Sequence, residues 1–231
     1  MVSLRDTGKI VGPSASIQQI AKNCGLSFPL SLRDFINTSG CPFSQCVRLH
    51  IKVLTEPRDF TIDEMVEAMR IVYATAKIAV QIVSRETLSG SEFNDLQTVD
   101  VNDGCIGTTA EQDELFENDN FVGTNEIVIY FVRSTDPGLN GCASYPEGKP
   151  GAIVTRTASL WTLAHEVGHV LGLNHIAGEH QGCPDSNRDC CKTADFTRLM
   201  TGCSTSNITG TPTVSSTERN RMQNSSLSVV C

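Results

Sequence analysis

The segment from His165 to His175 (HEVGHVLGLNH) carries three imidazoles, one carboxylate and, seven residues after the first histidine, Gly172. His165 and His169 are four residues apart, so on a helix their rings lie on one face and can meet at a single metal ion. Glu166 then falls beside the open coordination position. A continuous helix would carry His175 about 9 Å further along the axis than His169, whereas a Zn–N bond is about 2 Å long. The helix must therefore end before His175, and Gly172 can end it because glycine adopts the left-handed conformation of helix C-termini.

These spacings predict a catalytic zinc site. Three neutral imidazoles leave one position of a tetrahedral Zn²⁺ ion open for water, whose pKa the metal lowers toward ~7. Glu166 would accept the proton of that water and later pass it to the departing amine. We therefore predict that His165, His169 and His175 hold one Zn²⁺ ion and that Glu166 is the general base and acid.

The full pattern, HExxHxxGxxH, resembles the signature of the metzincin clan of zinc endopeptidases, which also has a methionine turn downstream. Met200, within Arg198-Leu199-Met200-Thr201, stands where that methionine is expected. A lone methionine is usually core filler, so Met200 alone would be weak support. Several metzincin families have Glu, Asp, Ser or Pro after the third histidine, and here that residue is Ile176. The family within the clan therefore stays open.

The resemblance implies an α/β (α+β) fold with a twisted mixed sheet, a backing helix and an active-site helix above the cleft. A disulfide-rich, irregular lower subdomain would end in a C-terminal helix. We predict an N-terminal extension or pro-segment-like region at 1–45 and a catalytic domain at 46–231. The catalytic domain would have an upper part at 46–175 and a lower part at 176–231. A capping box of Ser215 and Glu218 predicts the last helix, at 215–226.

Apolar periodicity predicts the elements that must position the site. Three segments rich in β-branched residues predict strands, at 47–56, 77–84 and 126–133. Residues 61–76 have the pattern of an amphipathic helix that opens with a capping box of Thr61 and Glu64. The strand, helix, strand order favours a right-handed crossover in a mixed sheet. Residues 86–125 are acidic and turn-rich, and we expect a surface excursion there.

Two short extended segments, 141–146 and 151–156, precede the predicted zinc helix, which should begin near Ser159. In metzincins the first of these is the sheet edge that runs antiparallel to bound substrate. The resemblance implies this role for Cys142, Ala143, Ser144 and Tyr145. An exposed strand edge can template an extended peptide, whereas the alternative is an ordinary covered hairpin.

Ten cysteines in 231 residues indicate an oxidising compartment and as many as five disulfides. A thiolate zinc site would need matched C-x2-C pairs, which the spacing lacks. We expect a secreted or extracellular protein. Residues 1–12 do not read as a signal peptide, so we expect that any export signal has been removed or that export uses another route.

Cys24, in the tripeptide Asn23-Cys24-Gly25, has two interpretations. Several metzincin proforms are kept latent by a cysteine thiolate at the open zinc position, and Cys24 could act in this way. Replacing Cys24 by Ser should then raise activity. An even number of cysteines is more simply explained by Cys24 in a disulfide.

The charge balance argues against some partners. The chain has 18 basic and 26 acidic side chains, a net charge of −8, without a basic run that could follow nucleic acid or an anionic membrane. No apolar stretch approaches the ~20 residues that span a bilayer. Acidic segments at 100–104 and 117–120 do not complete a calcium loop, so calcium is not predicted. We expect a monomer that acts on protein or peptide substrates.

The leading functional prediction is a zinc-dependent endopeptidase that hydrolyses extended protein or peptide segments. One alternative is a binding or adhesion module that keeps the zinc as a structural staple. Glu166 argues against it, since a structural site needs no base and usually has a fourth protein ligand. A second alternative is an effector or toxin protease of narrow specificity, which would differ in target and not in mechanism.

Overall fold

The computed structural model describes most of the chain from residue 43 onward. The described residues are 43, 45–176, 191 and 194–231. The fold below belongs to one compact unit, 43–231. Cys24 lies outside the described residues.

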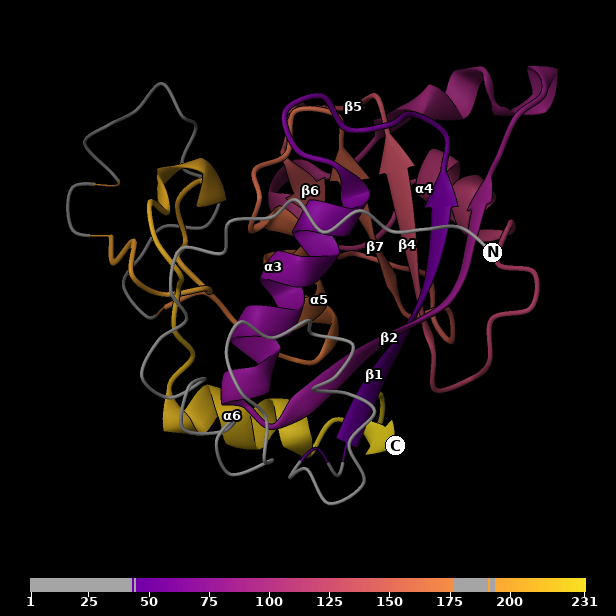
Figure 1. Cartoon of the computed structure of the whole chain (residues 1–231). Helices are drawn as coiled ribbons and strands as arrows, with labels where there is room; N and C mark the ends of the chain where they lie inside the picture. Colours follow the sequence, from indigo (N-terminus) through magenta and orange to yellow (C-terminus); the bar gives the residue numbers. More distant parts are fainter. Residues whose placement is uncertain (1–42, 44, 177–190, 192–193) are drawn as a thin grey trace, which may run out of the picture. The chain divides into compact units, whose positions relative to one another are not determined.

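A six-stranded mixed sheet forms the centre of this unit (Figure 1). The strand order is β2-β1-β4-β7-β6, and β8 pairs with the start of β1. Neighbours from β2 to β7 are parallel, whereas β6 runs antiparallel to β7 and forms the edge. The strands are β1 (Gln45–Val53), β2 (Ile78–Thr87), β4 (Ile127–Val132), β6 (Gly141–Cys142), β7 (Gly151–Thr155) and β8 (Val229–Val230). The predicted mixed sheet is confirmed.

The central strand β4 is buried along its whole length because both faces of the sheet are covered. Ile129 packs into one hydrophobic core, together with side chains from β1 and two helices. Val128 and Tyr130 point to the opposite face and pack into a second core. Alternate residues of one strand thus join two separate cores, as the period of a strand requires.

Helices α3 (Ile62–Thr75) and α5 (Thr162–Val170) share the core on one face of the sheet (Figure 1). The α3 helix begins with the predicted capping box, in which Thr61 and Glu64 exchange backbone and side-chain hydrogen bonds. The buried Tyr73 hydroxyl on α3 donates to the carbonyl oxygen of Ala164 on α5 at 3.0 Å. The predicted backing helix is therefore present, and it contacts the helix that carries the zinc motif.

The expectation of a surface excursion at 86–125 was wrong for its middle part, 96–116. Here β3 (Thr98–Asp100) pairs in parallel with β5 (Ser134–Asp136), and α4 (Ala110–Phe116) follows with its own capping box. These elements build the second core with four buried side chains, Leu96, Val99, Leu115 and Phe116. The apolar residues follow no single period because they come from several short elements. They cover the sheet face that a largely parallel sheet cannot leave in water.

Three disulfides join described cysteines: Cys46–Cys231, Cys105–Cys142 and Cys191–Cys203. The first links the start of β1 to the C-terminal residue across a sequence separation of 185. The remaining four cysteines lie outside the described residues. Disulfides are consistent with the predicted oxidising compartment.

The described residues of the lower part (176, 191 and 194–231) have little regular structure apart from a C-terminal helix, as expected. Helix α6 (Ser216–Gln223) begins with the predicted capping box of Ser215 and Glu218 and buries Met222. Arg198 pairs with Glu218 and so ties the segment before Met200 to this helix.

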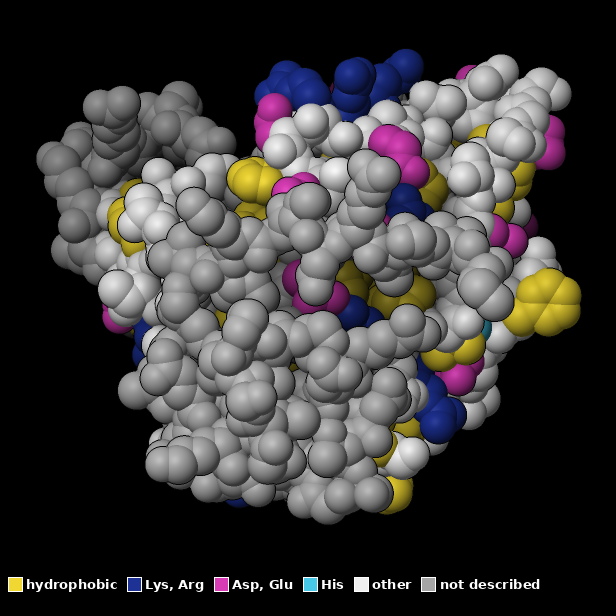
Figure 2. Space-filling view, in the orientation of Figure 1, with side chains coloured by type: hydrophobic (Ala, Val, Ile, Leu, Met, Phe, Trp, Pro, Cys, Tyr) yellow, Lys and Arg dark blue, Asp and Glu magenta, His cyan; other side chains and the backbone are white. Residues whose placement is uncertain are grey.

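The described surface mixes charges of both signs. Figure 2 shows Lys and Arg side chains in small groups with Asp and Glu side chains beside them. Arg85, for example, pairs with Glu56 and Asp63. No helix among the described residues is long and apolar enough to cross a membrane.

Candidate metal centre

The start of α5 is anchored by a cluster of three buried hydroxyl groups. The Thr205 hydroxyl lies 2.8 Å from that of Ser159 and 2.9 Å from that of Thr162. The backbone N–H of Ser159 donates to the Thr162 hydroxyl at 3.0 Å. These bonds form a turn ahead of the helix, so α5 begins at Thr162, three residues after the predicted start. They also tie the helix to the lower part of the domain through Thr205.

The end of α5 is a Schellman motif centred on Gly172. The Leu173 N–H donates to the Gly168 carbonyl at 2.9 Å, and the Gly172 N–H donates to the His169 carbonyl at 2.8 Å. Gly172 has a φ of 91°, a conformation that costs an L-residue free energy. This turn reverses the chain and carries His175 back toward the helix.

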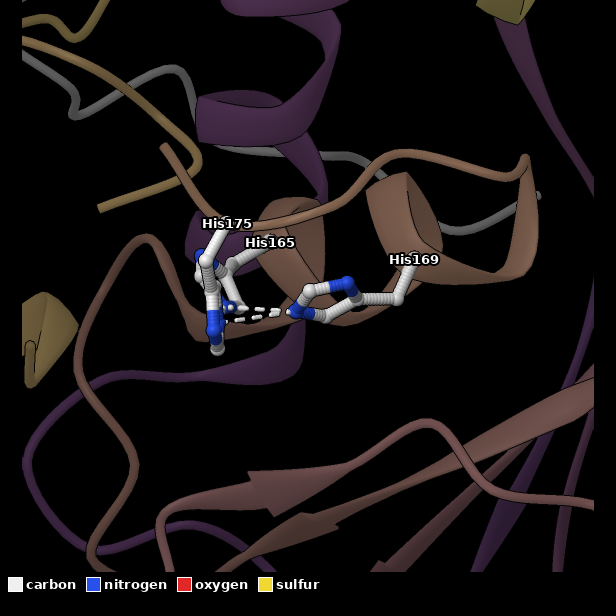
Figure 3. A group of neighbouring side chains, drawn as sticks. All are labelled: His165, His169 and His175. Carbon is white, nitrogen blue, oxygen red and sulfur yellow. Dashed lines mark hydrogen bonds between the residues drawn. The ribbon is translucent and has the colours of Figure 1, made fainter. Parts of the chain in front are cut away.

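The turn brings the three histidines of the motif together (Figure 3). The Nε2 atom of His169 lies 3.1 Å from those of His165 and His175, and the latter two are 3.2 Å apart. Two nitrogen ligands of a tetrahedral zinc ion, each ~2.05 Å from it, would stand about 3.3 Å apart. The triangle of nitrogen atoms therefore fits a zinc ion.

The hydrogen bonds of the rings leave lone pairs on two of the three converging nitrogens. His165 Nδ1 lies 2.7 Å from the Leu199 carbonyl oxygen, and His169 Nδ1 lies 2.9 Å from that of Leu173. A carbonyl oxygen only accepts, so each Nδ1 carries the single N–H of a neutral imidazole. Both Nε2 atoms then carry lone pairs, which face each other at 3.1 Å. Lone pairs at this distance repel, and a shared metal ion turns the repulsion into coordination.

The surroundings keep the rings of His165 and His169 neutral, which is the form that binds metal. Burial, followed by the neighbouring His169, lowers the pKa of His165 to about 3, against a smaller opposing effect of the Leu199 carbonyl. Burial also lowers the pKa of His169. At neutral pH a metal ion therefore meets little competition from protons at these two rings.

Glu166 lies between two of these histidines in sequence and is buried, with 7% of its surface exposed. Burial raises the pKa of its carboxyl group to about 8 in the absence of metal. A cation held by the neighbouring imidazoles would oppose this shift, because an opposite charge favours the carboxylate.

The segment around Met200 packs directly under the motif. Its Leu199 carbonyl orients His165, and its Met200 carbonyl accepts from the N–H of Ile176 at 3.0 Å. Met200 is fully buried, and its Sδ atom would lie only 2.8 Å from a Cβ placed on Gly168. The methionine thus occupies space that Gly168, at a variable position of the motif, leaves open, a reason for glycine that the sequence pattern did not supply.

The predicted substrate edge lies at the edge of the sheet, but only its first residue is in β6. Cys142 is buried, and Ala143, Ser144 and Tyr145 are partly exposed. The Ser144 carbonyl accepts from the side chain of Gln112 at 3.2 Å.

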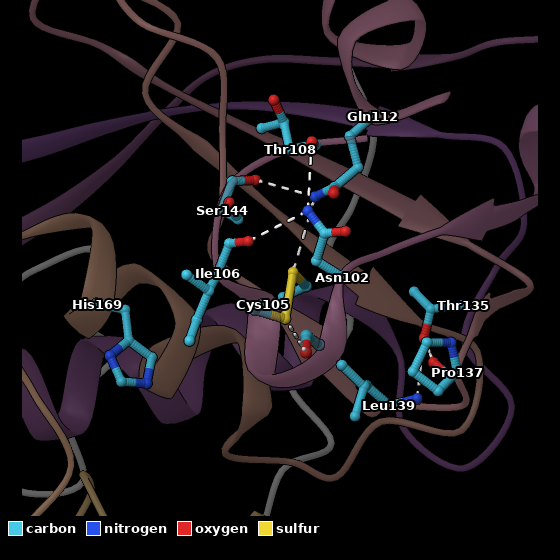
Figure 4. The surroundings of a disulfide bond; sticks show 12 residues. Asn102, Cys105, Ile106, Thr108, Gln112, Thr135, Pro137, Leu139, Ser144 and His169 are labelled. Atoms are coloured by element: carbon cyan, nitrogen blue, oxygen red, sulfur yellow. Dashed lines mark hydrogen bonds between the residues drawn. A yellow bond between two sulfur atoms is a disulfide. The ribbon is translucent and has the colours of Figure 1, made fainter. Parts of the chain in front are cut away.

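The segment with Cys105 and Ile106 lies along this edge. The sequence did not connect this segment with the site. The Cys105–Cys142 disulfide holds it there, and His169 is among the residues around the disulfide (Figure 4). Ile106, 72% exposed, lies between the disulfide and His169 in this view.

A search of the described residues for clusters of three or more potential metal ligands finds these three histidines. His50, on β1, is buried between the Ser84 hydroxyl at 2.8 Å and the Glu126 carboxylate at 2.7 Å. It links β1 to β2 and to the start of β4. His180 and Cys24 lie outside the described residues.

No protein-family model matches this sequence, and no curated protein matches it either. Among solved structures, metalloproteinase-II from Bacteroides fragilis is similar with a TM-score of 0.51 and 18% identity, over 88% of this chain and 60% of that chain. Archaemetzincin from Methanopyrus kandleri gives a TM-score of 0.45 and 17% identity, over 78% of this chain and 94% of that one. Archaemetzincin from Archaeoglobus fulgidus gives a TM-score of 0.41 and 13% identity, over 75% of this chain and 99% of that one.

The likeness to the Bacteroides fragilis protein concerns the fold alone, and this chain spans 60% of that protein's length. The two archaemetzincin scores, both below 0.5, carry no further weight. The chain thus has a fold that is similar to that of a bacterial metalloproteinase.

Proposed function

We propose that this protein is a zinc-dependent endopeptidase with the metzincin type of site. The observation that carries the proposal is the convergence of the three Nε2 atoms, two with lone pairs set by backbone carbonyls, beside a buried carboxylate. His165, His169 and His175 would hold the ion. Catalytic zinc sites have three protein ligands and an open position, which is the set that the described residues offer.

When bound, zinc lowers the pKa of a water molecule toward ~7 and polarises the carbonyl of the scissile peptide. Glu166 would accept a proton from the attacking water and would then deliver it to the departing amine nitrogen. The burial of Glu166 suits this shuttle, because it keeps the proton exchange out of bulk water. The carbonyls of Leu199 and Leu173 keep the first two rings in the metal-binding tautomer.

The substrate would be an extended segment of a protein or peptide, aligned along Cys142 to Tyr145 at the sheet edge. The edge position of β6 supports this, since strand edges bind extended chains through backbone hydrogen bonds. Ile106 stands beside this path and would offer an apolar contact to the substrate. The extension at 1–45 and a latency role for Cys24 stay predictions.

The test separates metal binding from catalysis. We expect Glu166→Ala protein to keep one zinc per chain while peptide cleavage falls by several orders of magnitude, because the base is lost and the ligands remain. His169→Ala protein should lose both. Zinc content by elemental analysis, with cleavage of a peptide library followed by mass spectrometry, gives both readouts.

Two outcomes would contradict the proposal: wild-type protein with a full complement of zinc that cleaves nothing, or Glu166→Ala protein that cleaves at the wild-type rate. The first outcome would favour a binding module in which zinc is structural. Incubation of active protein with a mixed proteome then distinguishes a broad endopeptidase from an effector with one target.

A further inference from the structure

Gly141, the first residue of the edge strand β6, lies against the side chain of Glu166. A Cβ atom placed on Gly141 would be 2.6 Å from Oε1, 2.7 Å from Cγ and 2.8 Å from Cδ of Glu166. All three distances are shorter than any that real Cβ atoms maintain. The backbone of Gly141 is therefore one wall of the space that the carboxylate occupies.

The local backbone does not explain this glycine. Gly141 pairs with Val154 of β7 in ordinary antiparallel register, and its φ lies outside the left-handed region that favours glycine. Any L-residue could adopt the same conformation. The space taken by Glu166 is what excludes a side chain.

The Glu166 side chain has few alternative conformations. It sits within α5, where the preceding turn limits the side chain to a few rotamers, and it is buried. A Cβ at position 141 would push the carboxylate aside rather than break the fold, because the clash is with a side chain and not with backbone. A catalytic group displaced by about 1 Å can lose on the order of 100-fold in rate.

We propose that Gly141 is a positioning residue for Glu166, which sets the place of the catalytic carboxylate from the strand that also aligns the substrate. The inference rests on the proposed endopeptidase function. It assigns to this glycine the task of joining the two halves of the site: β6 beside the substrate and α5 with the metal ligands and the base.

Gly141→Ala is the direct test, and Gly138→Ala is its matched control, since a Cβ at Gly138 meets nothing within 4 Å. We expect kcat of the zinc-loaded Gly141→Ala protein to fall about 100-fold. KM and zinc content should stay near the wild-type values, because neither the ligands nor the strand pairing changes. Gly138→Ala should leave kcat unchanged. Crystal structures of the wild-type and Gly141→Ala proteins should show the Glu166 carboxylate displaced in the variant.

A double-mutant cycle in thermal stability tests the contact without any activity measurement. In the wild-type background, Gly141→Ala should lower the melting temperature. In a Glu166→Ala background the same change should lower it much less, because Cγ, Cδ and Oε1 of Glu166 are gone. The cycle also covers the case in which Gly141→Ala alone fails to fold, since the double variant should then recover folding.

An unchanged kcat in Gly141→Ala protein, or an equal loss of melting temperature in both backgrounds, would overturn the inference. A double variant that stays unfolded would do the same. These results differ from failure of the proposed function, which would appear as inactive, zinc-loaded wild-type protein while the stability cycle still reports the contact.

Discussion

At the scale of single residues, the chemistry depends on which ring nitrogen carries a proton. Two backbone carbonyls, of Leu199 and Leu173, accept from the Nδ1 atoms of His165 and His169. One carbonyl belongs to the segment before Met200 and the other to the turn after α5. The tautomers that zinc needs are thus set by main-chain atoms, which side-chain substitutions do not remove.

The buried Glu166 predicts a pH dependence for the metal-free protein. Burial raises the pKa of its carboxyl group to about 8, against an ordinary value of 4.5. The folded state then binds this proton more tightly than the unfolded state, so stability is lost as pH rises from about 4.5 to about 8. Between about pH 3 and pH 6.5, His165 makes stability rise with pH, because its pKa is lower in the folded state than in the unfolded state. Between pH 6.5 and 8 Glu166 therefore dominates this pair.

Urea unfolding in the presence of EDTA checks this dependence. From pH 6.5 to 8, the free energy of unfolding of wild-type protein should fall relative to Glu166→Gln protein by at most about 1.4 kcal/mol per pH unit. Saturating zinc should remove most of this difference, because the cation favours the carboxylate. Parallel stability curves for the two metal-free proteins would show that Glu166 is ionised throughout this range.

At the scale of elements, the site depends on how α5 begins and ends. The hydroxyl groups of Ser159, Thr162 and Thr205 hold its start, and the Schellman turn at Gly172 holds its end. From the other side, the Arg221 side chain of α6 donates to the Gly172 carbonyl at 3.2 Å. The C-terminal helix therefore stabilises the turn that brings His175 back to the other two histidines.

Substitution of Gly172 should weaken both stability and metal binding. The φ of 91° costs a residue with a Cβ about 1–2 kcal/mol, whereas the nearest atom to such a Cβ would be 3.9 Å away. The penalty is thus backbone strain and not a clash. Gly172→Ala should lose about this much unfolding free energy and should bind zinc less tightly, since relaxation of the turn moves His175. Denaturant unfolding and zinc titration measure the two effects.

Gly172→Asn is the matched control, because asparagine tolerates the left-handed conformation better than alanine does. It should therefore lose less in both measurements. Equal losses for the two variants would mean that the left-handed conformation is not the reason for glycine at this position.

At the scale of the whole described unit, one disulfide joins its two ends. Cys46 at the start of β1 is bonded to Cys231, and the adjacent β8 pairs with the same end of β1. The separation of 185 residues makes this a very long closed loop, and long loops restrict the unfolded chain most.

Removal of this disulfide should lower stability without changing the metal site. The Cys46→Ala/Cys231→Ala protein should lose about 2–5 kcal/mol of unfolding free energy, because its unfolded state regains loop entropy. Zinc stoichiometry should stay at the wild-type value, since the ligands come from α5 and the turn after it. Denaturant unfolding and elemental analysis give the two values. Loss of zinc from folded variant protein would mean that the disulfide supports the metal centre directly.

The sequence by itself determined what depends on neighbours along the chain. The zinc motif spans eleven residues, so its helical spacing and the glycine that ends the helix follow from local geometry. The capping boxes at Thr61 and Ser215 predicted where two helices begin, because each needs only a pair of residues three apart. Strong β-branched runs likewise predicted the central strands, with ends that differ by up to three residues.

Only the tertiary structure decided which distant residues meet. The segment around Leu115 became a second core because the sheet face needed a cover, and no periodic pattern announces that need. The sequence placed Gly141 at the start of a short extended segment, and only the fold sets it against Glu166. The partner of Cys105 was open for the same reason. Spacing records the chemistry that a short segment can perform, whereas packing between segments far apart in sequence depends on the complete fold.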